Sequence, residues 1–362
     1  MTGGDLDWDG IARSFAMQAK ACAKDNASPT SAAILNGCAG ALAGAHPFKQ
    51  ILAGWHDHRP MAAVPLRVLG ALHRLALDGA APGLAALMPS AGGTANPERA
   101  WAAAEPAIAA HAPFIAAYLT RAPQTNEVGR SAMLLGGFLE IAATARLPLR
   151  LLEIGASAGL NLCWDRYRVR SDVFSWGDPA APLALATEWH GPAPPLNAAV
   201  AVAAREACDR DPLDVTNPDD VRRMESYVWC DQLDRLRRLR TAVAIARQTP
   251  FSLDRADAGD WLARKLADPA PGAATVVFHS VMWQYMDAAT QARIAGLIGA
   301  AGARATPAAP IAWLAMEPSD LKSYPTVTLT MWPGGDRRTL GTVHFHGAWA
   351  RWGAGGGAVW NA

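Results

Sequence analysis

The residues with the clearest chemical meaning lie in the segment LRLLEIGASAGLNL, at positions 149–162. An apolar run ends at Ile154 and is followed by small residues from Gly155 to Gly159, which predicts a buried strand, a tight turn and the start of a helix. Glycines in such a turn let the backbone approach a ligand where a Cβ atom would collide. Glu153 adds a carboxylate near the end of the strand, where nucleotide-like cofactors lie. The alternative is an ordinary strand-to-helix turn of an α/β protein.

A second group of chemically capable side chains occurs in FHSVMWQY, at positions 278–285, directly after a buried strand pattern. Polar groups at the carboxyl end of a central strand lie in the ligand crevice of such sheets. His279 is a candidate base, because imidazole suits proton transfer at neutral pH. Gln284 and Tyr285 are candidates to orient a substrate, and Trp283 to bind one through a cation–π contact of about 0.5–2 kcal/mol. Alternatively, the two aromatic residues belong to the core and His279 is a structural histidine.

The polar segment PQTNEVGR, at positions 123–130, stands just before a helical pattern. Asn126, Glu127 and Arg130 would project from one first turn and would face a cofactor if this helix packs over the sheet. Asn126 and Arg130 are then cofactor-binding candidates, and Glu127 is a second candidate proton acceptor. In the alternative interpretation, Thr125 or Asn126 is a plain N-cap and the Glu127–Arg130 pair lies on the surface, where it contributes little.

These candidates must be positioned by two kinds of structure. Residues 1–148 are rich in alanine and show helical spacing, whereas apolar strand patterns alternate with helices from residue 149 onward. This alternation indicates a parallel sheet. Val327–Trp332 and Thr339–His346 flank a Gly-Gly-Asp turn and predict a terminal antiparallel hairpin. We therefore predict an α/β protein, with a helical cap or substrate domain at 1–148 and a Rossmann-like, mostly parallel α/β domain at 149–362.

Composition narrows the possible partners and compartment. The 33 basic and 32 acidic residues give a net charge of +1, which favours neither nucleic acid nor an anionic membrane as a partner. The five cysteines form no C-x-x-C pair, and no apolar run reaches transmembrane length. We expect a cytoplasmic protein with a small-molecule substrate. We expect no metal site, because His344 and His346 lack further converging ligands.

The strand–GASAG–helix segment, the later strands and the closing hairpin together resemble the class I S-adenosylmethionine-dependent methyltransferase fold, over roughly residues 149–350. The strings PQTNEVGR, EIGASAGLNL and FHSVMWQY, with CDRDPLDV at 208–215, are similar to a bacterial family of unknown function that has a methyltransferase-like domain. This second resemblance extends over nearly the whole chain. It implies S-adenosylmethionine as the cofactor and brings no established substrate.

The resemblance also implies roles for residues of the first turn. Glu153, Gly155 and Gly159 match the E-x-G-x-x-x-G form of the cofactor loop, and Ser157 lies inside that loop. A pyrophosphate-binding loop would more often read G-x-G-x-x-G. S-adenosylmethionine has no phosphate, so the turn would only need to pass close to its methionyl part.

Two further acidic positions acquire roles from the resemblance. An acidic residue that ends the second strand would hold the ribose hydroxyls, and the candidate is Asp209, with Asp172 as the alternative. The dipeptide Asp257-Ala258 would contact the adenine, unless Asp257 is simply the N-cap of a helix.

The expected function is therefore methyl transfer from S-adenosylmethionine to an unidentified small molecule. Two alternatives stay open. One is a non-catalytic binding or regulatory protein on the same scaffold. The other is an NAD-type oxidoreductase, against which the missing G-x-G-x-x-G argues.

Overall fold

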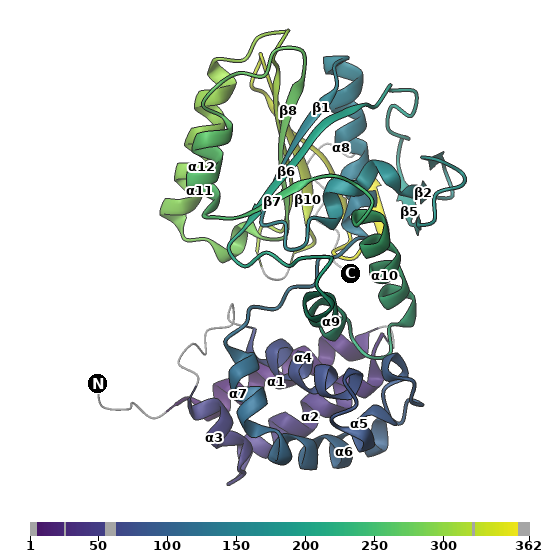
Figure 1. The fold of residues 1–362 in the computed structure, drawn as a ribbon, viewed down its shortest axis with the longest axis vertical. Coiled ribbons are helices and arrows are strands. Elements are labelled where there is room, and N and C mark those ends of the chain that lie inside the picture. Colours follow the sequence, from purple (N-terminus) through teal and green to yellow (C-terminus); the bar gives the residue numbers. More distant parts are fainter. Residues whose placement is uncertain (1–5, 25–26, 55–62, 321–322, 354–362) are drawn as a thin grey trace. The chain divides into compact units, whose positions relative to one another are not determined.

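The computed structural model describes residues 6–24, 27–54, 63–320 and 323–353 and divides into two compact units (Figure 1). The helical unit comprises Met1–Thr125 and Asn217–Leu239, and the α/β unit comprises Asn126–Thr216 and Arg240–Ala362. This division differs from the sequence-based boundary at residue 148 in two ways. The helix that precedes the first strand belongs to the α/β unit, and a segment inserted after residue 216 completes the helical unit.

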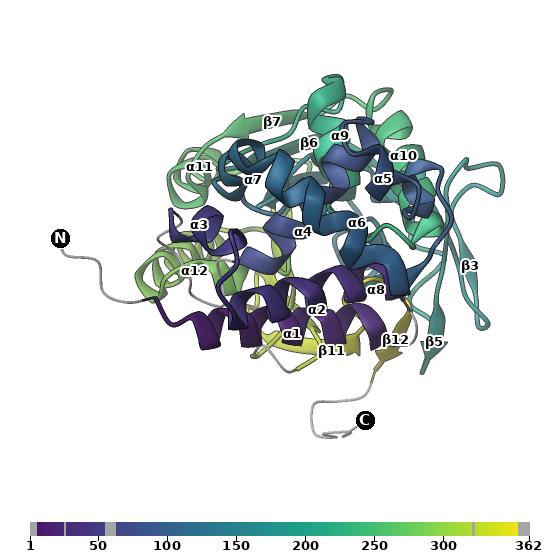
Figure 2. The ribbon, with the colours of Figure 1, turned by 90° about the horizontal axis from the view of Figure 1, so that it is seen from below.

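The helical unit is built from short helices around an apolar core. Its helices are α1 (Trp8–Ala23), α2 (Pro29–Ala43), α3 (Phe48–Ala53), α4 (Val64–Leu77), α5 (Pro82–Ala85), α6 (Pro97–Ala110), α7 (Ala112–Leu119), α9 (Pro218–Ser226) and the first part of α10 (Leu233–Ala246), with a 3-10 turn, η3 (Pro89–Ala91). Figure 2 shows α1 and α2 side by side. Helix α6 ends and α7 begins around His111, because Pro113 lacks the N–H that a continuous helix needs.

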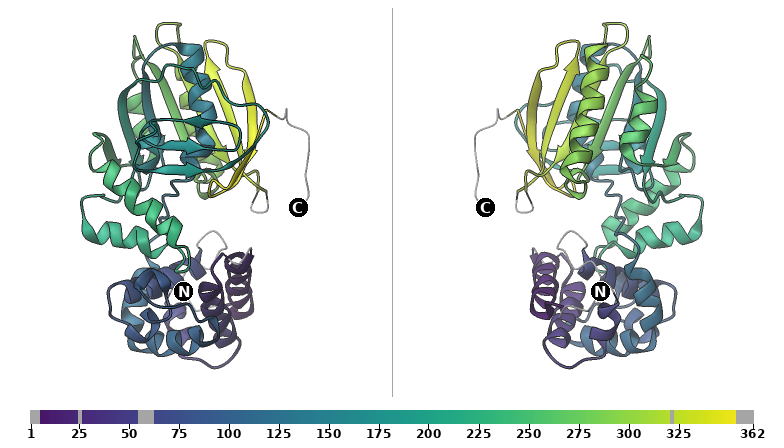
Figure 3. Two further views of the ribbon diagram at one scale, coloured as in Figure 1. Left: turned by 90° about the vertical axis from the view of Figure 1, so that its right-hand side faces the viewer. Right: turned by 90° about the vertical axis from the view of Figure 1, so that its left-hand side faces the viewer.

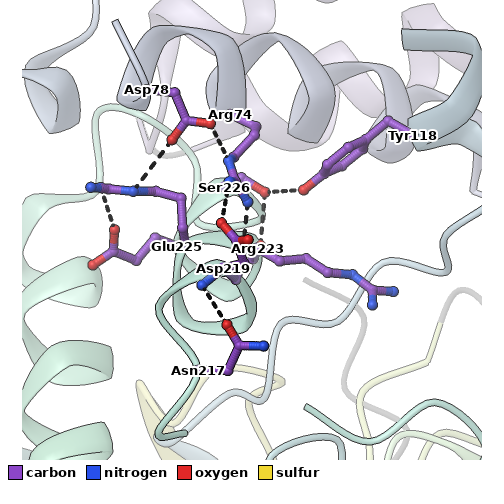
Figure 4. A network of polar contacts seen from close by, with 9 residues as sticks. Arg74, Asp78, Tyr118, Asn217, Asp219, Arg223, Glu225 and Ser226 are labelled. Atoms are coloured by element: carbon purple, nitrogen blue, oxygen red, sulfur yellow. Dashed lines mark hydrogen bonds and ion pairs between the residues drawn. The ribbon is translucent and has the colours of Figure 1, made fainter. Parts of the chain in front are cut away.

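Helix α9 is fastened to α4 and α7 by polar contacts (Figure 4). The Arg74 guanidinium donates to the Asp219 carboxylate at 3.0 Å, and the hydroxyls of Tyr118 and Ser226 lie 2.7 Å apart. His73 is buried and contacts the Ser226 carbonyl through Nδ1 at 3.0 Å. These contacts place the inserted segment in the helical unit, although it lies between two strands in the sequence.

Residues 227–247 have the Leu and Arg pattern of one amphipathic helix, but α10 covers only part of this range. Helix α9 ends at Ser226 and α10 begins at Leu233, and the intervening Asp231 caps α2. One carboxylate oxygen of Asp231 accepts from the Thr30 backbone N–H at 2.9 Å and from the Ser28 hydroxyl at 2.7 Å. A tertiary contact of this kind satisfies helix donors that would otherwise be unpaired.

The α/β unit contains all the strands. They are β1 (Leu149–Ile154), β2 (Arg168–Arg170), β3 (Ser175–Trp176), β4 (Ala184–Ala186), β5 (Glu188–His190), β6 (Val202–Asp209), β7 (Ser252–Arg255), β8 (Ala274–Ser280), β9 (Ile311–Glu317), β10 (Thr326–Trp332), β11 (Arg337–Val343) and β12 (Trp349–Trp352). Its helices are α8 (Arg130–Ala145), the last part of α10, α11 (Ala258–Lys265) and α12 (Ala288–Ala303), with the 3-10 segments η4 (Leu160–Arg166) and η5 (Trp283–Tyr285).

The main sheet has the order β5-β12-β11-β10-β9-β8-β1-β6-β7. Strands β7, β6, β1, β8 and β9 are parallel neighbours, and β10 and β11 form the predicted antiparallel hairpin. Helix α8 covers one face of the sheet and α12 covers the other (Figure 3). The Rossmann-like α/β prediction is therefore confirmed.

The sheet order defines where a ligand is expected. The chain runs from β1 outward to β6 and β7, then returns to the other side of β1 to form β8 and β9. Ligands of open α/β sheets bind outside the carboxyl ends of the strands at such a switch point. We call the ends of these five parallel strands the carboxyl edge. Strand β8 is buried along its whole length, as expected for a central strand covered on both faces.

The segment between β1 and β6 forms a small second sheet, in the order β3-β2-β4. Within this sheet, β2 and β3 form an antiparallel hairpin, and β4 pairs with β2 in parallel. Among the described residues, no helix has the length and apolarity needed to cross a membrane.

Candidate functional site

The turn after β1 has the backbone that its glycines require. Gly155 and Gly159 have φ of +66° and +72°, and Ser157 between them has φ of +56°. A Cβ atom on Gly155 would lie 2.8 Å from Cε of Met282, and one on Gly159 would lie 2.9 Å from the ring of Phe251. The missing Cβ atoms thus make room for neighbouring side chains of the same unit, which is a different reason from the predicted approach of a ligand. The 3-10 segment η4 follows the turn, where we expected an α-helix.

Asn126 binds the backbone of this turn. Its Oδ1 accepts from the backbone N–H groups of Ala158 at 3.1 Å and Leu160 at 3.2 Å. The N-cap alternative for Asn126 is wrong, because the N-cap of α8 is Gly129. The polar segment before α8 therefore lies beside the turn, and cofactor binding by Asn126 stays a prediction.

Asp209, at the end of β6, is also bound to the turn. Its Oδ2 accepts from the Ser157 N–H at 2.8 Å, and its Oδ1 accepts from the Asp211 N–H at 2.9 Å. Each oxygen keeps one further lone pair for a ligand. Asp172 lies between β2 and β3, away from the ends of the parallel strands, and its Oδ1 accepts from the Trp189 N–H at 3.0 Å. Of the two candidates, only Asp209 lies at the carboxyl edge.

Glu153 is the most unusual group at this edge. Its side chain is buried, with 3% of the residue exposed, and its Oε2 has no hydrogen-bond partner among the described residues. Burial raises the pKa of this carboxyl well above its ordinary value; the charge of Asp209 raises it further, and that of Arg130 lowers it. The buried hydroxyl of Ser157 also has no hydrogen-bond partner among the described residues. Such groups cost about 1–3 kcal/mol each, so two of them on one turn need an explanation.

Arg130 and Glu127 connect the start of α8 to other parts of the carboxyl edge. The Arg130 guanidinium donates to the carbonyl of Ser280, which ends β8, at 3.0 Å, and to the carbonyl of Phe345 at 3.3 Å. Glu127 is 3% exposed, so the surface-pair alternative is wrong. Its Oε1 accepts from the Gly129 N–H at 3.0 Å.

His279 is saturated by hydrogen bonds inside the protein. Its Nδ1 lies 2.7 Å from Oε1 of Glu317, and its Nε2 lies 3.0 Å from Nε1 of Trp313. Because an indole N–H only donates, Nε2 must accept and Nδ1 must carry the proton. With 1% of the residue exposed, no lone pair of His279 is available to a substrate. The prediction of His279 as a catalytic base is therefore wrong, and the alternative of a structural histidine holds.

Glu317, at the end of β9, is a site residue that we did not predict from the sequence. Besides binding His279, its carboxylate accepts from the backbone N–H of Met282 at 3.1 Å and of Trp283 at 3.3 Å. It thereby holds the strained turn after β8, where Val281 has φ of +52°. The sequence contains a signal for this residue, because Glu317 lies at the end of an apolar strand pattern, as Glu153 and Asp209 do.

A family profile described as "Uncharacterized protein conserved in bacteria (DUF2332)" matches residues 12–352. The chain belongs to this bacterial family. No curated protein and no solved structure matches it. The likeness to a bacterial family of unknown function, drawn from four sequence strings, is thereby confirmed, whereas the family description contains no methyltransferase activity.

The remaining aromatic candidates of the DUF2332 protein lie in or next to η5. The ring of Trp283 stacks on His279, with centroids 5.0 Å apart and planes 16° apart, and it packs against the core beneath α11 and α12. The core alternative therefore describes Trp283. It does not describe Tyr285, which is 60% exposed, and Gln284 beside it is half-buried. The substrate roles of Trp283, Gln284 and Tyr285 stay predictions.

Asp257 and Ala258 lie just beyond β7, at the same carboxyl edge. Asp257 is the N-cap of α11, and its Oδ1 accepts from the N–H groups of Gly259 at 2.9 Å and Asp260 at 3.2 Å. Ala258 is buried. The capping alternative is thus confirmed for Asp257, and its contact with an adenine stays a prediction.

Proposed function

We propose that this DUF2332 protein transfers a methyl group from S-adenosylmethionine to a small-molecule acceptor at the carboxyl edge of its α/β unit. The observation that carries the proposal is the buried carboxyl of Glu153 at the switch point of the sheet, whose Oε2 has no hydrogen-bond partner among the described residues. An unpaired carboxyl in such surroundings favours a cationic ligand, because a nearby positive charge stabilises its ionised form.

The residues present fit the chemical groups of S-adenosylmethionine. Its methionyl part carries an ammonium group and a sulfonium centre, which suit the Glu153 carboxyl, and the Ser157 hydroxyl offers a further polar contact. The lone pairs left on Asp209 suit the neighbouring hydroxyls of a ribose. The Glu153 carboxyl beside the turn opposes a dinucleotide, because its ionised form would repel a pyrophosphate bound there. The arrangement therefore favours S-adenosylmethionine over NAD.

The other residues of the edge act by positioning. Asn126 and Asp209 hold the turn after β1, and Arg130 joins the start of α8 to the end of β8. When bound, S-adenosylmethionine supplies an activated methyl group. The protein contributes by holding the acceptor in line with that group, and such orientation supplies up to about 7–11 kcal/mol in favourable cases.

Titration calorimetry with S-adenosylmethionine, S-adenosylhomocysteine and NAD tests the proposal. We expect saturable binding of the first two and none of NAD. Asp209→Asn should weaken binding of S-adenosylhomocysteine at least tenfold. Asp172→Asn is the matched control and should leave it unchanged, since that carboxylate accepts from the Trp189 N–H in β5, away from the carboxyl edge. No heat at millimolar S-adenosylhomocysteine, or preferential binding of NAD, would overturn the proposal.

A non-catalytic binding protein is the second candidate, and two observations favour it. His279 has both ring nitrogens engaged, and the Met282 side chain packs where an additional Cβ on Gly155 would lie. Binding of S-adenosylhomocysteine, combined with no methyl transfer to any cellular small molecule from labelled S-adenosylmethionine, would favour this second candidate.

A further inference from the structure

The turn that follows β8 contains a backbone conformation that its residue type disfavours. Val281 has φ of +52°, and a β-branched side chain in this left-handed region is a genuine outlier. Two further non-glycine residues with positive φ, Asn126 at +32° and Ser157 at +56°, bind or belong to the neighbouring turn after β1. Strain of this kind persists only where the surroundings impose it, and it clusters at ligand sites and switch regions.

The backbone of this segment is held by β9 and α12. We call residues 281–283 the Met282 turn. Glu317, at the end of β9, accepts from the N–H groups of Met282 at 3.1 Å and Trp283 at 3.3 Å. From α12, the side-chain amide of Gln291 donates to the Trp283 carbonyl at 2.9 Å. These bonds fix backbone atoms, so they do not restrict rotation of the Met282 side chain.

The Met282 side chain lies across Gly155, in the turn after β1. A Cβ atom on Gly155 would lie 3.1 Å from Cβ, 2.9 Å from Cγ and 2.8 Å from Cε of Met282. Because three atoms of one side chain lie near this position, the side chain runs over the Gly155 backbone. Met282 is only half-buried, and a methionine adapts to more than one packing because it is unbranched and has three rotatable bonds.

The order of the strands shows which part of a cofactor Met282 would meet. Asp209, the candidate for the ribose, ends β6 on one side of β1, whereas the Met282 turn follows β8 on the other side. Glu153 lies on β1 itself, two residues before Gly155, and its carboxyl suits the cationic methionyl part. Met282 therefore covers the methionyl side of the candidate site.

We propose that Met282 closes the methionyl part of the cofactor site in the ligand-free protein and that the cofactor displaces it; this inference rests on the proposed function. A ligand binds only the open fraction of such a protein, so its measured affinity is reduced by that fraction. The strained φ of Val281 sets the direction in which the Met282 side chain leaves the backbone, which gives the strain a function.

Titration calorimetry with S-adenosylhomocysteine and adenosine tests the inference. Met282→Ala removes the covering atoms, and the Kd of S-adenosylhomocysteine should fall about fivefold, as for a site that is open about one fifth of the time. Adenosine lacks the methionyl part, so its Kd should not change. Met286→Ala is the matched control, because Met286 is also half-buried and packs against the same core beneath α11 and α12. It should leave both affinities unchanged.

Thermal unfolding of the same variants separates closure from packing. Both alanine variants remove a half-buried methionine, so both should have a lower Tm than the wild type. Only Met282→Ala should also bind S-adenosylhomocysteine more tightly, which a merely structural role of Met282 would not produce. Met282→Val lacks Cε but keeps part of the packing, so it serves if the alanine variant does not fold. It should show a smaller gain in the same direction.

The outcomes separate the two proposals. If the wild type binds S-adenosylhomocysteine and the Met282 variants bind it no more tightly, closure by Met282 is overturned and the proposed function stands. An equal gain for adenosine also overturns closure, because the effect is then not confined to the methionyl part. If the wild type does not bind S-adenosylhomocysteine at all, the proposed function fails, and with it the inference that depends on it.

Discussion

Replacing Glu153 by glutamine tests the central physical claim. This claim is that Oε2 of the buried Glu153 carboxyl, at the switch point of the sheet, has no hydrogen-bond partner among the described residues. Burial raises the pKa of Glu153 well above its ordinary value of 4.5, with the charge of Asp209 adding to the effect and that of Arg130 opposing it. Between the ordinary and the raised value, the folded protein binds more protons than the unfolded chain. Stability therefore falls as the pH rises through this window, and Glu153 contributes no penalty below about pH 4.5.

Glutamine has nearly the same shape and carries no charge at any pH. We expect Glu153→Gln to be more stable than the wild type at pH 8 by about 1–3 kcal/mol, because the amide has no ionisation penalty and one pKa unit corresponds to about 1.4 kcal/mol. For a unit of this size, that free energy corresponds to an increase of roughly 2–12 °C in Tm. The same substitution should weaken S-adenosylhomocysteine binding at least tenfold, or about 1.4 kcal/mol, because the cationic part of the ligand loses its counter-charge.

The assay is thermal unfolding followed by circular dichroism at several pH values between 5 and 8, at constant ionic strength. Glu206→Gln is the matched control on the adjacent strand β6. Desolvation tends to raise the pKa of Glu206, but hydrogen bonds from Lys265 and Arg150 outweigh it and the pKa is lowered. That control should therefore be less stable than the wild type at neutral pH and should approach it in acid, which is the opposite sign.

The reasoning is refuted if Glu153→Gln is less stable than the wild type at pH 8, or if the difference in Tm is the same at pH 5 and pH 8. Either result would mean that the Glu153 carboxyl has a partner in solution. A stabilised variant that still binds S-adenosylhomocysteine normally would keep the electrostatic claim and remove Glu153 from the binding site.

Three further outcomes are expected. Gly155→Ala should lower the free energy of unfolding in urea by about 1–3 kcal/mol, because its φ is +66° and its Cβ would meet Met282; Gly299→Ala, with open space in α12, should be neutral or slightly stabilising, and equal stability of the two variants would contradict this. His73 is buried and its pKa is lowered to about 4, so the helical unit should lose about 3 kcal/mol as the pH falls from about 6.5 to 4. A urea titration of His73→Gln should show a flatter pH dependence, and an unchanged slope would exclude His73 as its source. Asp231→Ala removes the acceptors at the start of α2 and should cost about 1–3 kcal/mol, seen as faster amide hydrogen exchange in α2; unchanged exchange would argue against the cap.

Local pattern was sufficient for much of the fold. The strand ending at Glu153, the buried strand β8 and the hairpin of β10 and β11 follow from apolar runs and turn residues that need no long-range information. The amphipathic pattern over 227–247 is longer than the helix that forms there. Its first residues form a connection whose Asp231 satisfies the N-terminus of α2, about 200 residues earlier in the chain, and periodicity carries no such information.

The candidate site divides in the same way. Glu153 was found at the end of an apolar strand pattern, Asn126 in the polar segment before a helical pattern, and Asp209 as what the resemblance implies for the end of the second strand. The structural role of His279 was not found from the sequence, because an imidazole acts as a base only if one ring nitrogen stays available. That depends on Glu317 and Trp313, which β9 brings beside β8. The contact between His346 and Glu127 also could not be found from local patterns, because the two residues are far apart in the sequence.

The sequence alone thus determined the class of fold, the turn after β1 and the family, because each depends on residue type and spacing within short segments. Tertiary structure decided the rest. It placed the insertion at 217–239 in the helical unit, engaged both nitrogens of His279 and gave Oε2 of Glu153 no hydrogen-bond partner in the described part of the chain. The physical reason is that hydrogen bonding and burial belong to the surroundings of a side chain, and those surroundings come from segments far apart in the chain.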